Sequence, residues 1–131
     1  MVRWLAEAEI EPVVGGHVVL RWLNTDQRAE NQAVMHGTIT KLVPNAVLEI
    51  NSDIHGLLRW HLERDGNGCT LRFSSALPVP NDQVMLALAG WHIHLEHLAD
   101  ALDGKPVDWP NWMADHYNRW SELHVRYIAT L

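Results

Sequence analysis

The stretch LLRWHLERDGNGCTLRFSSA, residues 57–76, is the part of the sequence that decides the fold. It holds two runs in which apolar and polar residues alternate, separated by the turn sequence Asp65-Gly66-Asn67-Gly68. Alternation with a period of two is typical of a strand with one buried face, and two such runs around a glycine-rich turn predict a β-hairpin. The apolar members are Leu58, Trp60, Leu62, Cys69, Leu71 and Phe73. Their polar neighbours favour antiparallel strands with one face in solvent.

The chain before this hairpin also has strand character. Short alternating runs bounded by proline, glycine or asparagine predict four more strands, at residues 7–11, 17–23, 33–43 and 46–51. The pair Gly15-Gly16 indicates a turn, because glycine adopts positive φ at little cost. Gly37 indicates a bulge or a close approach of two backbones. We interpret the polar segment 24–31 as a loop.

After the hairpin the apolar period becomes helical. Spacings of four and three residues predict a helix of about 20 residues, whose apolar stripe consists of Val84, Leu88, Trp91, Leu95, Leu98 and Leu102. We expect Asn81 or Asp82 to cap its start, and Gly104 with Pro106 to end it. We expect this stripe to be buried against the apolar face of the sheet.

A last helix is expected from Asn111 to the C-terminus. Its shared aromatic and apolar face consists of Met113, Tyr117, Trp120, His124, Tyr127 and Leu131. Because the strands come first and the helices follow, the sequence predicts an α+β fold. The expected architecture is an antiparallel sheet of about six strands, a long helix and an extra C-terminal helix.

Composition narrows the class of protein. The chain has 131 residues, enough for one domain with one apolar core. Asp and Glu total 16 against 10 Lys and Arg, and the resulting net charge of −6 disfavours binding to nucleic acid or to an anionic membrane. The single cysteine, Cys69, excludes an internal disulfide. Neither a membrane span nor a signal-peptide core is evident, so we expect a soluble cytoplasmic protein.

The segment 91–97, WHIHLEH, is the most metal-like motif. On a helix, His94 and His97 share one face, and His92 and Glu96 share another. A metal site usually needs three or more protein ligands, and no H-E-x-x-H pattern occurs. We therefore predict no metal and no cofactor. The main interpretation is that His92 and Glu96 lie on the solvated side of the helix, with His94 as the residue that could reach a ligand.

Sequence motifs for catalysis are weak. Asp65-Gly66-Asn67-Gly68 is a hairpin turn and not a phosphate loop, because no helix follows it. Cys69 begins a strand outside any nucleophile motif, and no serine lies in G-x-S-x-G. An enzyme would need a buried titratable group, for which the candidates are His36, His55, His61 and His94. We expect a binding protein rather than an enzyme.

Seven tryptophans in 131 residues are unusual. A tryptophan supplies a large apolar area and one N–H donor, which suits a core or the lining of an apolar pocket. The two interpretations are compatible, because a curved sheet under one helix can leave a gap that serves as a ligand site. The predicted ligand-binding residues are Trp22, Ile39, Trp60, Trp91 and His94.

Several segments resemble one protein family in the same order along the chain. Residues 90–98, GWHIHLEHL, followed by LDGKP at 102–106, resemble the family signature "GW..hL..L...L.G.p". Gly15-Gly16-His17-Val18 resembles the family's "GG.f", Gly37-Thr38-Ile39 its "G.v", and the hairpin 60–71 its "feL...g.gT.L". The family comprises the bacterial proteins similar to the activator of the heat-shock protein ATPase. It lies within the SRPBCC (START-like, helix-grip) superfamily.

This resemblance implies a helix-grip fold, in which a curved antiparallel sheet wraps a long helix around an apolar cavity. It implies binding of a hydrophobic or amphipathic small molecule between sheet and helix. The alternatives are a protein-interaction or co-chaperone-like role, because a shared fold is not a shared function, and a cyclase- or hydrolase-type enzyme as in the wider superfamily. The resemblance predicts a helix-grip domain at 1–106 and a helical extension at 107–131.

The resemblance also predicts a homodimer. Relatives begin with a strand and two short helices before the tryptophan that matches Trp4, and these elements are expected to be missing here. Without them the strand Cys69–Ala76 would be a bare sheet edge, which invites pairing with another chain. The aromatic face of the C-terminal helix would add to a two-fold contact. The alternative is a monomer whose last helix folds back on its own domain.

Overall fold

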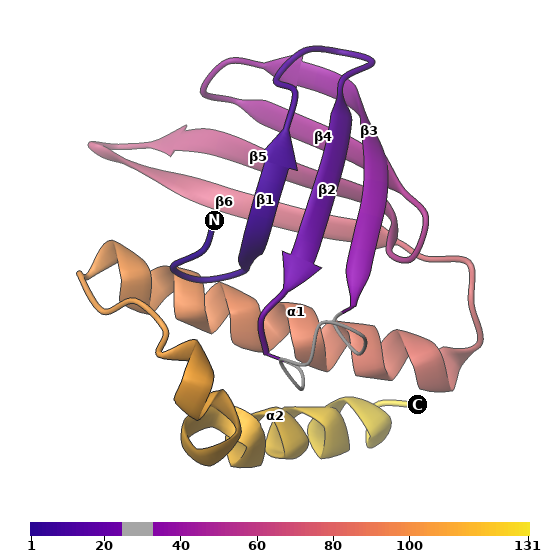
Figure 1. The fold of residues 1–131 in the computed structure, drawn as a ribbon, viewed down its shortest axis with the longest axis vertical. Coiled ribbons are helices and arrows are strands. Elements are labelled where there is room, and N and C mark those ends of the chain that lie inside the picture. The colour runs from indigo at the N-terminus through magenta and orange to yellow at the C-terminus, as the bar shows by residue number, and fades with distance from the viewer. Residues whose placement is uncertain (25–32) are drawn as a thin grey trace. The chain divides into compact units, whose positions relative to one another are not determined.

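The computed structural model describes residues 1–24 and 33–131. Six strands form one sheet in sequential order, with antiparallel pairing, as predicted (Figure 1). The strands are β1 (Ala6–Ile10), β2 (His17–Trp22), β3 (Val34–Val43), β4 (Val47–Ser52), β5 (Gly56–Asp65) and β6 (Gly68–Ala76). The segment 24–31, predicted as a loop, lies outside the described residues apart from Asn24.

The chain divides into two compact units. One consists of residues 1–7, 21–33 and 79–131, and it holds the helices. The other consists of residues 8–20 and 34–78, and it holds most of the sheet. The predicted domain boundary near residue 106 does not coincide with a division between these two units. It stays a prediction.

The hairpin of β5 and β6 forms as predicted. Trp60 pairs with Phe73 and Leu62 with Leu71, so the apolar residues of both strands share one face. The pairing ends at Asp65 and Gly68, and Gly66 in the turn has φ of +57°. The Thr70 hydroxyl donates a hydrogen bond of 3.3 Å to the Asp65 carboxylate across the turn.

Gly37 marks a close approach and not the bulge itself. A Cβ atom at this position would lie 2.7 Å from Cγ2 of Ile50 and 3.0 Å from the backbone oxygen of Asn51. The register between β3 and β4 shifts instead between Ile39 and Lys41. Only glycine leaves room for β4 to lie this close to β3 at Gly37.

The helical half contains α1 (Asn81–Leu102), a short 3₁₀ helix η1 (Trp109–Asn111) and α2 (Trp112–Ile128). The predicted cap of α1 was wrong, because the N-cap is Pro80 and no side chain caps the helix. Asn111 is the N-cap of α2 as expected, but its side-chain amide donates to Oδ2 of Asp108 at 2.7 Å and does not cap the helix. Gly104, with φ of +81°, follows α1 as predicted.

The apolar stripe predicted for α1 was partly wrong. Trp91 is buried, but Leu88 is 39% exposed and Leu102 79% exposed. The buried residues of α1 are Met85, Ala89, Trp91, Ile93, His94 and His97. The difference arises because α1 has a second covered face, which contacts α2 and which a single apolar stripe does not predict.

Helix α2 lies alongside α1 of the same chain (Figure 1). A small core joins them, made of Ala89, Ile93, Trp112 and Leu123, with half-buried Trp120 and Tyr127 against it. Trp120 and Tyr127 are therefore partly covered within the same chain, whereas Tyr117 is 43% exposed. This is the folded-back arrangement of the last helix that the sequence left as the alternative.

Polar contacts continue this seam between the helices. Arg119 of α2 makes two hydrogen bonds to the Glu96 carboxylate, of 2.6 and 3.2 Å, and its side chain lowers the pKa of Glu96. Nδ1 of His92 lies 2.7 Å from the hydroxyl oxygen of Tyr127. The expectation that His92 and Glu96 lie on the solvated side of the helix holds only in part: their side chains are 38% and 36% exposed, but both also contact α2.

Candidate functional site

Three of the five predicted ligand-binding residues lie together. Trp22 stands at the end of β2, and Trp91 and His94 lie three positions apart on α1, which places them on one helix face. The ring centroids of Trp22 and Trp91 are 5.5 Å apart, and those of Trp22 and His94 are 5.4 Å apart, both edge to face. All three side chains are buried. Trp22 contacts both of the other rings, so the group combines two apolar indole rings with one imidazole.

His94 is held in a defined orientation. Its side chain is only 3% exposed, and its Nδ1 lies 2.6 Å from the backbone oxygen of Gly90, one turn earlier on α1. A carbonyl oxygen can only accept, so Nδ1 carries the proton and Nε2 is an acceptor in the neutral ring. The ring of Trp109 stacks against His94 at a centroid distance of 6.1 Å. His94 is thus a positioned acceptor within an aromatic environment.

The aromatic group continues into a series of imidazoles. His97, 2% exposed, lies 5.6 Å from the ring of His94 and 4.6 Å from that of His116 on α2. Its Nε2 accepts a hydrogen bond of 3.0 Å from the indole N–H of Trp112. Burial, and then the neighbouring imidazoles of His94 and His116, lower the pKa of His97 to about 4, against an opposing effect of Glu96. His97 is therefore a neutral structural acceptor at pH 7.

The N-terminal segment positions Trp109. The indole N–H of Trp109 donates to the backbone oxygen of Val2 at 2.6 Å, and the backbone N–H of Val107 donates to that of Arg3 at 3.0 Å. These two bonds tie the connector between α1 and α2 to the first residues of the chain. Trp109 contacts the rings of both His94 and His97, so the same bonds fix one wall of the aromatic group.

The other two predicted site residues lie on the sheet. Ile39 is buried and pairs with Ile50, whereas Trp60 is half-buried and contacts Phe73 at a centroid distance of 5.2 Å. Both belong to the second unit, whereas Trp22, Trp91 and His94 belong to the first. The five-residue site stays a prediction.

The remaining histidine candidates have ordinary structural surroundings. Burial lowers the pKa of His55, opposed by Asp53, and its backbone oxygen accepts from the Ser75 hydroxyl. Nδ1 of His61 lies 3.7 Å from Oε1 of Glu63, at the surface of β5. These positions are turn and strand-surface positions, which favours neither as a catalytic acid or base.

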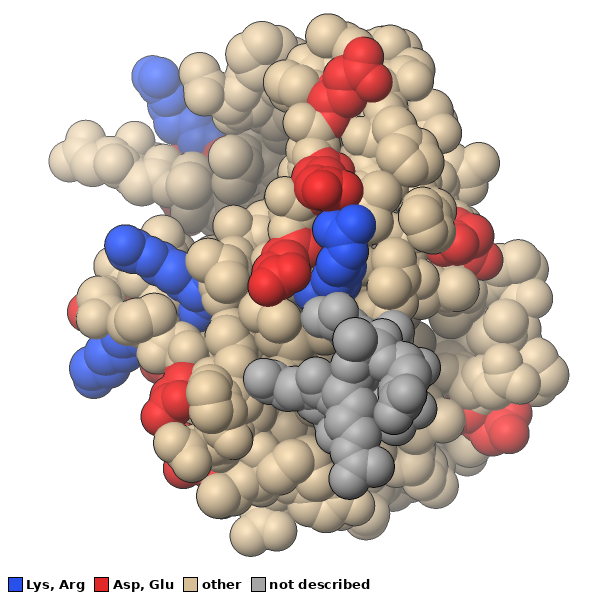
Figure 2. Space-filling view, in the orientation of Figure 1, with Lys and Arg blue, Asp and Glu red and all other residues tan. Residues whose placement is uncertain are grey.

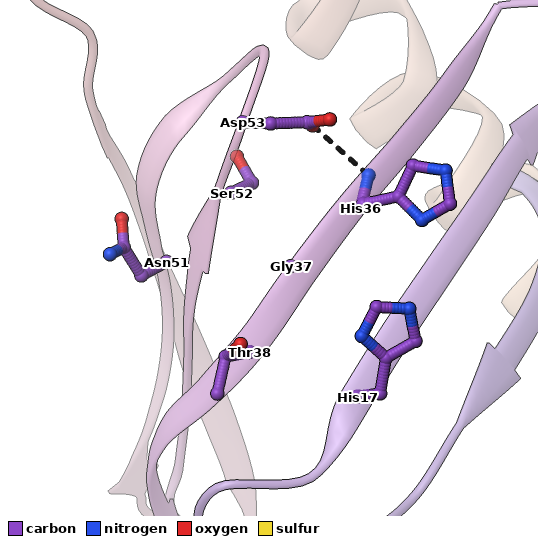
Figure 3. A pocket seen from close by; sticks show the side chains of 7 residues that line it. All are labelled: His17, His36, Gly37, Thr38, Asn51, Ser52 and Asp53. Atoms are coloured by element: carbon purple, nitrogen blue, oxygen red, sulfur yellow. Dashed lines mark hydrogen bonds between the residues drawn. The ribbon is translucent and has the colours of Figure 1, made fainter.

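A cleft that the sequence did not indicate lies on the polar face of the sheet (Figure 3). Its volume is about 320 Å³, and it is lined by His17, His36, Gly37, Thr38, Asn51, Ser52 and Asp53. The rings of His17 and His36 lie side by side with centroids 5.7 Å apart. Sequence reasoning missed this pair because the residues are 19 positions apart and only the strand register brings them together.

On the face shown in Figure 2, acidic and basic side chains are dispersed, and no basic patch of the kind that binds nucleic acid is visible among the coloured atoms. Within residues 1–24 and 33–131, no group of three or more His, Cys, Asp or Glu could hold a metal ion. In the same part of the chain, none of the helices has the length and apolarity needed to cross a membrane.

A six-stranded antiparallel sheet followed by a long helix defines an α+β protein with the elements of the helix-grip class. Within that class, the chain belongs to the family described as Activator of Hsp90 ATPase homolog 1-like protein, whose family model matches residues 1–103. The resemblance inferred from the sequence is thereby confirmed. Helix α2 lies beyond the matched range.

Solved structures agree on the fold. A Bordetella parapertussis protein with a solution NMR structure is 22% identical, with a TM-score of 0.71 over 99% of this chain and 73% of that one. The crystal structure of CalU16 from Micromonospora echinospora is 18% identical, with a TM-score of 0.66 over 97% of this chain and 69% of that one. At this identity the likeness establishes the fold alone. No curated protein matches the sequence.

Proposed function

We propose that this protein binds a hydrophobic or amphipathic small molecule through Trp22, Ile39, Trp60, Trp91 and His94. The observation that carries the proposal is the group of Trp22, Trp91 and His94 on one side of α1. Ring faces supply apolar contact area to a ligand, and one positioned polar group fixes its orientation. His94 suits that role, because its Nδ1–H is engaged by Gly90 and its tautomer is set.

The sheet supports the proposal with accessible apolar surface. The row Ile39–Ile50–Leu58 across three strands is fully buried. In the adjacent row, Trp60 pairs with Leu48 and Phe73, and all three are only partly buried. Partly exposed aromatic surface beside a buried row is what an apolar ligand needs for contact.

Tryptophan fluorescence with an apolar probe tests this proposal. Single Trp→Phe substitutions at Trp22, Trp60 and Trp91 should each reduce the quenching caused by the bound probe, because each removes one quenched fluorophore. Trp120→Phe on α2 is the matched control and should leave the probe-dependent quenching unchanged. Equal quenching in all four variants, or no saturable quenching of the parent protein, contradicts the proposal. Native mass spectrometry of the purified protein reports any co-purified small molecule.

A co-chaperone-like interaction role is the second candidate. It is favoured by exposed apolar side chains on α2 and directly after it, namely Met113, Tyr117, Val125, Ile128 and the C-terminal Leu131. Addition of the protein to a purified Hsp90-type ATPase should then raise the rate of ATP hydrolysis, and Tyr117→Lys should reduce the effect. An unchanged rate excludes this role, whereas a small-molecule site would still show in the fluorescence experiment.

We further propose a homodimer that pairs through the edge of β6. This strand is last in the sheet order, so one of its edges faces no other strand within the described residues. It has nine residues without proline, and bare edges of this kind favour pairing with a second chain. Sedimentation equilibrium should give the mass of two chains, and Ser74→Lys should shift the equilibrium toward one. A parent protein with the mass of a single chain contradicts the dimer.

A further inference from the structure

We propose that His17 and His36 form a binding site for a late first-row divalent metal ion of the Ni²⁺, Cu²⁺ and Zn²⁺ type. The site is the polar cleft of Figure 3, which lies wholly within the sheet unit and is independent of the apolar site proposed above. Three features of the cleft favour a metal ion: the register of two strands, the exposure of both imidazoles, and the charge around them.

A bulge at the start of β2 sets the register. Gly15, with φ of +84°, donates its backbone N–H to the oxygen of Ile39, and Ile39 donates in return to the oxygen of Gly16, at 2.8 and 2.9 Å. Gly15 and Gly16 thus both lie opposite Ile39 on β3, which defines a β-bulge. Gly15 has the left-handed backbone conformation that this type of bulge requires. Pairing continues from there in opposite directions, so His17 lies opposite Thr38 and diagonal to His36.

The two imidazoles project from the same face of neighbouring strands (Figure 3). Both side chains are exposed, and their ring centroids are 5.7 Å apart with the planes tilted by 34°. An ion bonded to one nitrogen of each ring at about 2.0–2.1 Å can span such a pair with small rotations of the side chains. Diagonal neighbours in a sheet are within reach of each other's long side chains.

Two hydrogen bonds to Asp53 hold the backbone of His36 in place. Little backbone ordering is therefore needed when an ion binds. Asp53 accepts a hydrogen bond from the N–H of His36 through Oδ1, at 3.0 Å. Its own backbone N–H donates to the oxygen of His36 at 2.9 Å. On the other side of the pair, Oε2 of Glu11 accepts from the backbone N–H of His17 at 3.5 Å.

The carboxylates of Asp53 and Glu11 determine whether the cleft favours a cation or an anion. Asp53 places negative charge beside the backbone of His36 and Glu11 beside that of His17, and the chain as a whole carries −6. An anion is therefore disfavoured and a cation favoured. Neutral imidazole is a preferred ligand of nickel, copper and zinc, whereas magnesium and calcium prefer oxygen. With two protein ligands, water fills the other coordination positions of the ion. Such a site does not need three or more His, Cys, Asp or Glu side chains, and no group of that size that could hold a metal ion occurs among the described residues.

Nickel titration tests this inference. The full chain, freed of metal with EDTA, is titrated with NiCl₂ at neutral pH in a calorimeter, and the histidine ring signals are followed by NMR. We expect one saturable binding event, loss of the His17 and His36 ring signals through paramagnetic broadening, and reversal by EDTA. MgCl₂ at the same concentration should produce neither effect.

Substitutions locate the ion. His17→Ala and His36→Ala should each abolish the saturable event, and both positions are exposed, so near-UV circular dichroism should remain unchanged. His61→Ala, on the surface of β5, is the matched control and should bind nickel as the parent does. Unchanged binding in His36→Ala, loss of binding in His61→Ala, or broadening confined to other histidines overturns the proposal.

Discussion

The indole N–H of Trp112 donates to Nε2 of His97 over 3.0 Å, and both side chains are almost fully buried. This bond joins the first residue of α2 to the buried side of α1, beside the apolar contacts of Ala89, Ile93 and Leu123. It requires a neutral imidazole, because only an unprotonated Nε2 can accept. The attachment of α2 thus depends on the protonation state of one residue.

Acid should destabilise the protein through His97. The folded-state pKa of about 4 lies below the ordinary value of 6.5, so the unfolded state binds more protons between these values. The contribution to stability is complete above pH 6.5 and is lost as the pH falls to 4, by roughly 2 to 3 kcal/mol in total. The groups around the ring are His94, His116 and Glu96.

Urea unfolding across this pH range measures the effect. His97→Gln keeps a neutral side chain that can accept from Trp112, so it should flatten most of the slope between pH 6.5 and 4. His61→Gln at the strand surface serves as the control and should keep the parent slope. Parallel pH profiles for the parent and His97→Gln contradict the assignment.

Removing both partners of this hydrogen bond should cost less than the two single removals added together. Trp112→Phe leaves the buried Nε2 of His97 without its donor, and we expect a loss of about 1–3 kcal/mol in the free energy of unfolding. In the double variant Trp112→Phe/His97→Leu, the cost should be smaller than the sum of the two single changes. Chemical denaturation of all three variants completes the cycle, and simple additivity would argue against a coupling between the two side chains.

Two glycines should respond in opposite directions to alanine. Gly37→Ala places a Cβ 2.7 Å from Ile50 and 3.0 Å from the Asn51 oxygen, and the overpacking should cost about 1–3 kcal/mol. Gly90→Ala adds a Cβ that has no atom within 4 Å apart from its chain neighbours and the backbone of its own helix. It lies inside α1, so it should stabilise the protein by up to about 1 kcal/mol. Thermal melts of the pair check the signs, and a stabilised Gly37→Ala would refute the close approach.

Trp91→Ala should be the most damaging of the single changes. Trp91 is buried and contacts Trp22 edge to face, and truncation of a large buried aromatic costs about 3–5 kcal/mol. Leu88→Ala, three residues earlier on the exposed part of α1, is the matched comparison and should cost much less. Equal denaturation midpoints for the parent and Trp91→Ala would show that the residue is not part of the core.

The sequence predicts the elements of the fold well because their signals are local. The alternation of Leu58, Trp60 and Leu62 around a glycine turn needs no tertiary information, and Gly104 ends α1 for reasons of backbone conformation alone. The burial of His97 and the exposure of Leu88 were not predictable in this way. The burial of His97 depends on where α2 lies. An apolar period indicates that a helix face is covered, but it does not indicate which element covers it.

The candidate sites show the same division. Trp91 and His94 could be grouped because a helix places them one turn apart, and Trp22 joined them through its residue type. The pair of His17 and His36 required the Gly15 bulge, which shifts the pairing by one residue and so decides which side chains are neighbours. The sequence indicates a turn at Gly15-Gly16, but it does not show how many residues of each strand pair at that point.

The hydrogen bond from Trp109 to Val2 joins residues 107 positions apart. During synthesis, β1 and the residues before it therefore leave the ribosome long before Trp109, which holds them in the folded protein, has emerged. Contacts of such high sequence separation form late, because loop closure must precede them. The N-terminal segment should accordingly be the last part to gain protection from hydrogen exchange in a refolding experiment, after the local β5–β6 hairpin, and it should be the first part released when η1 is disturbed.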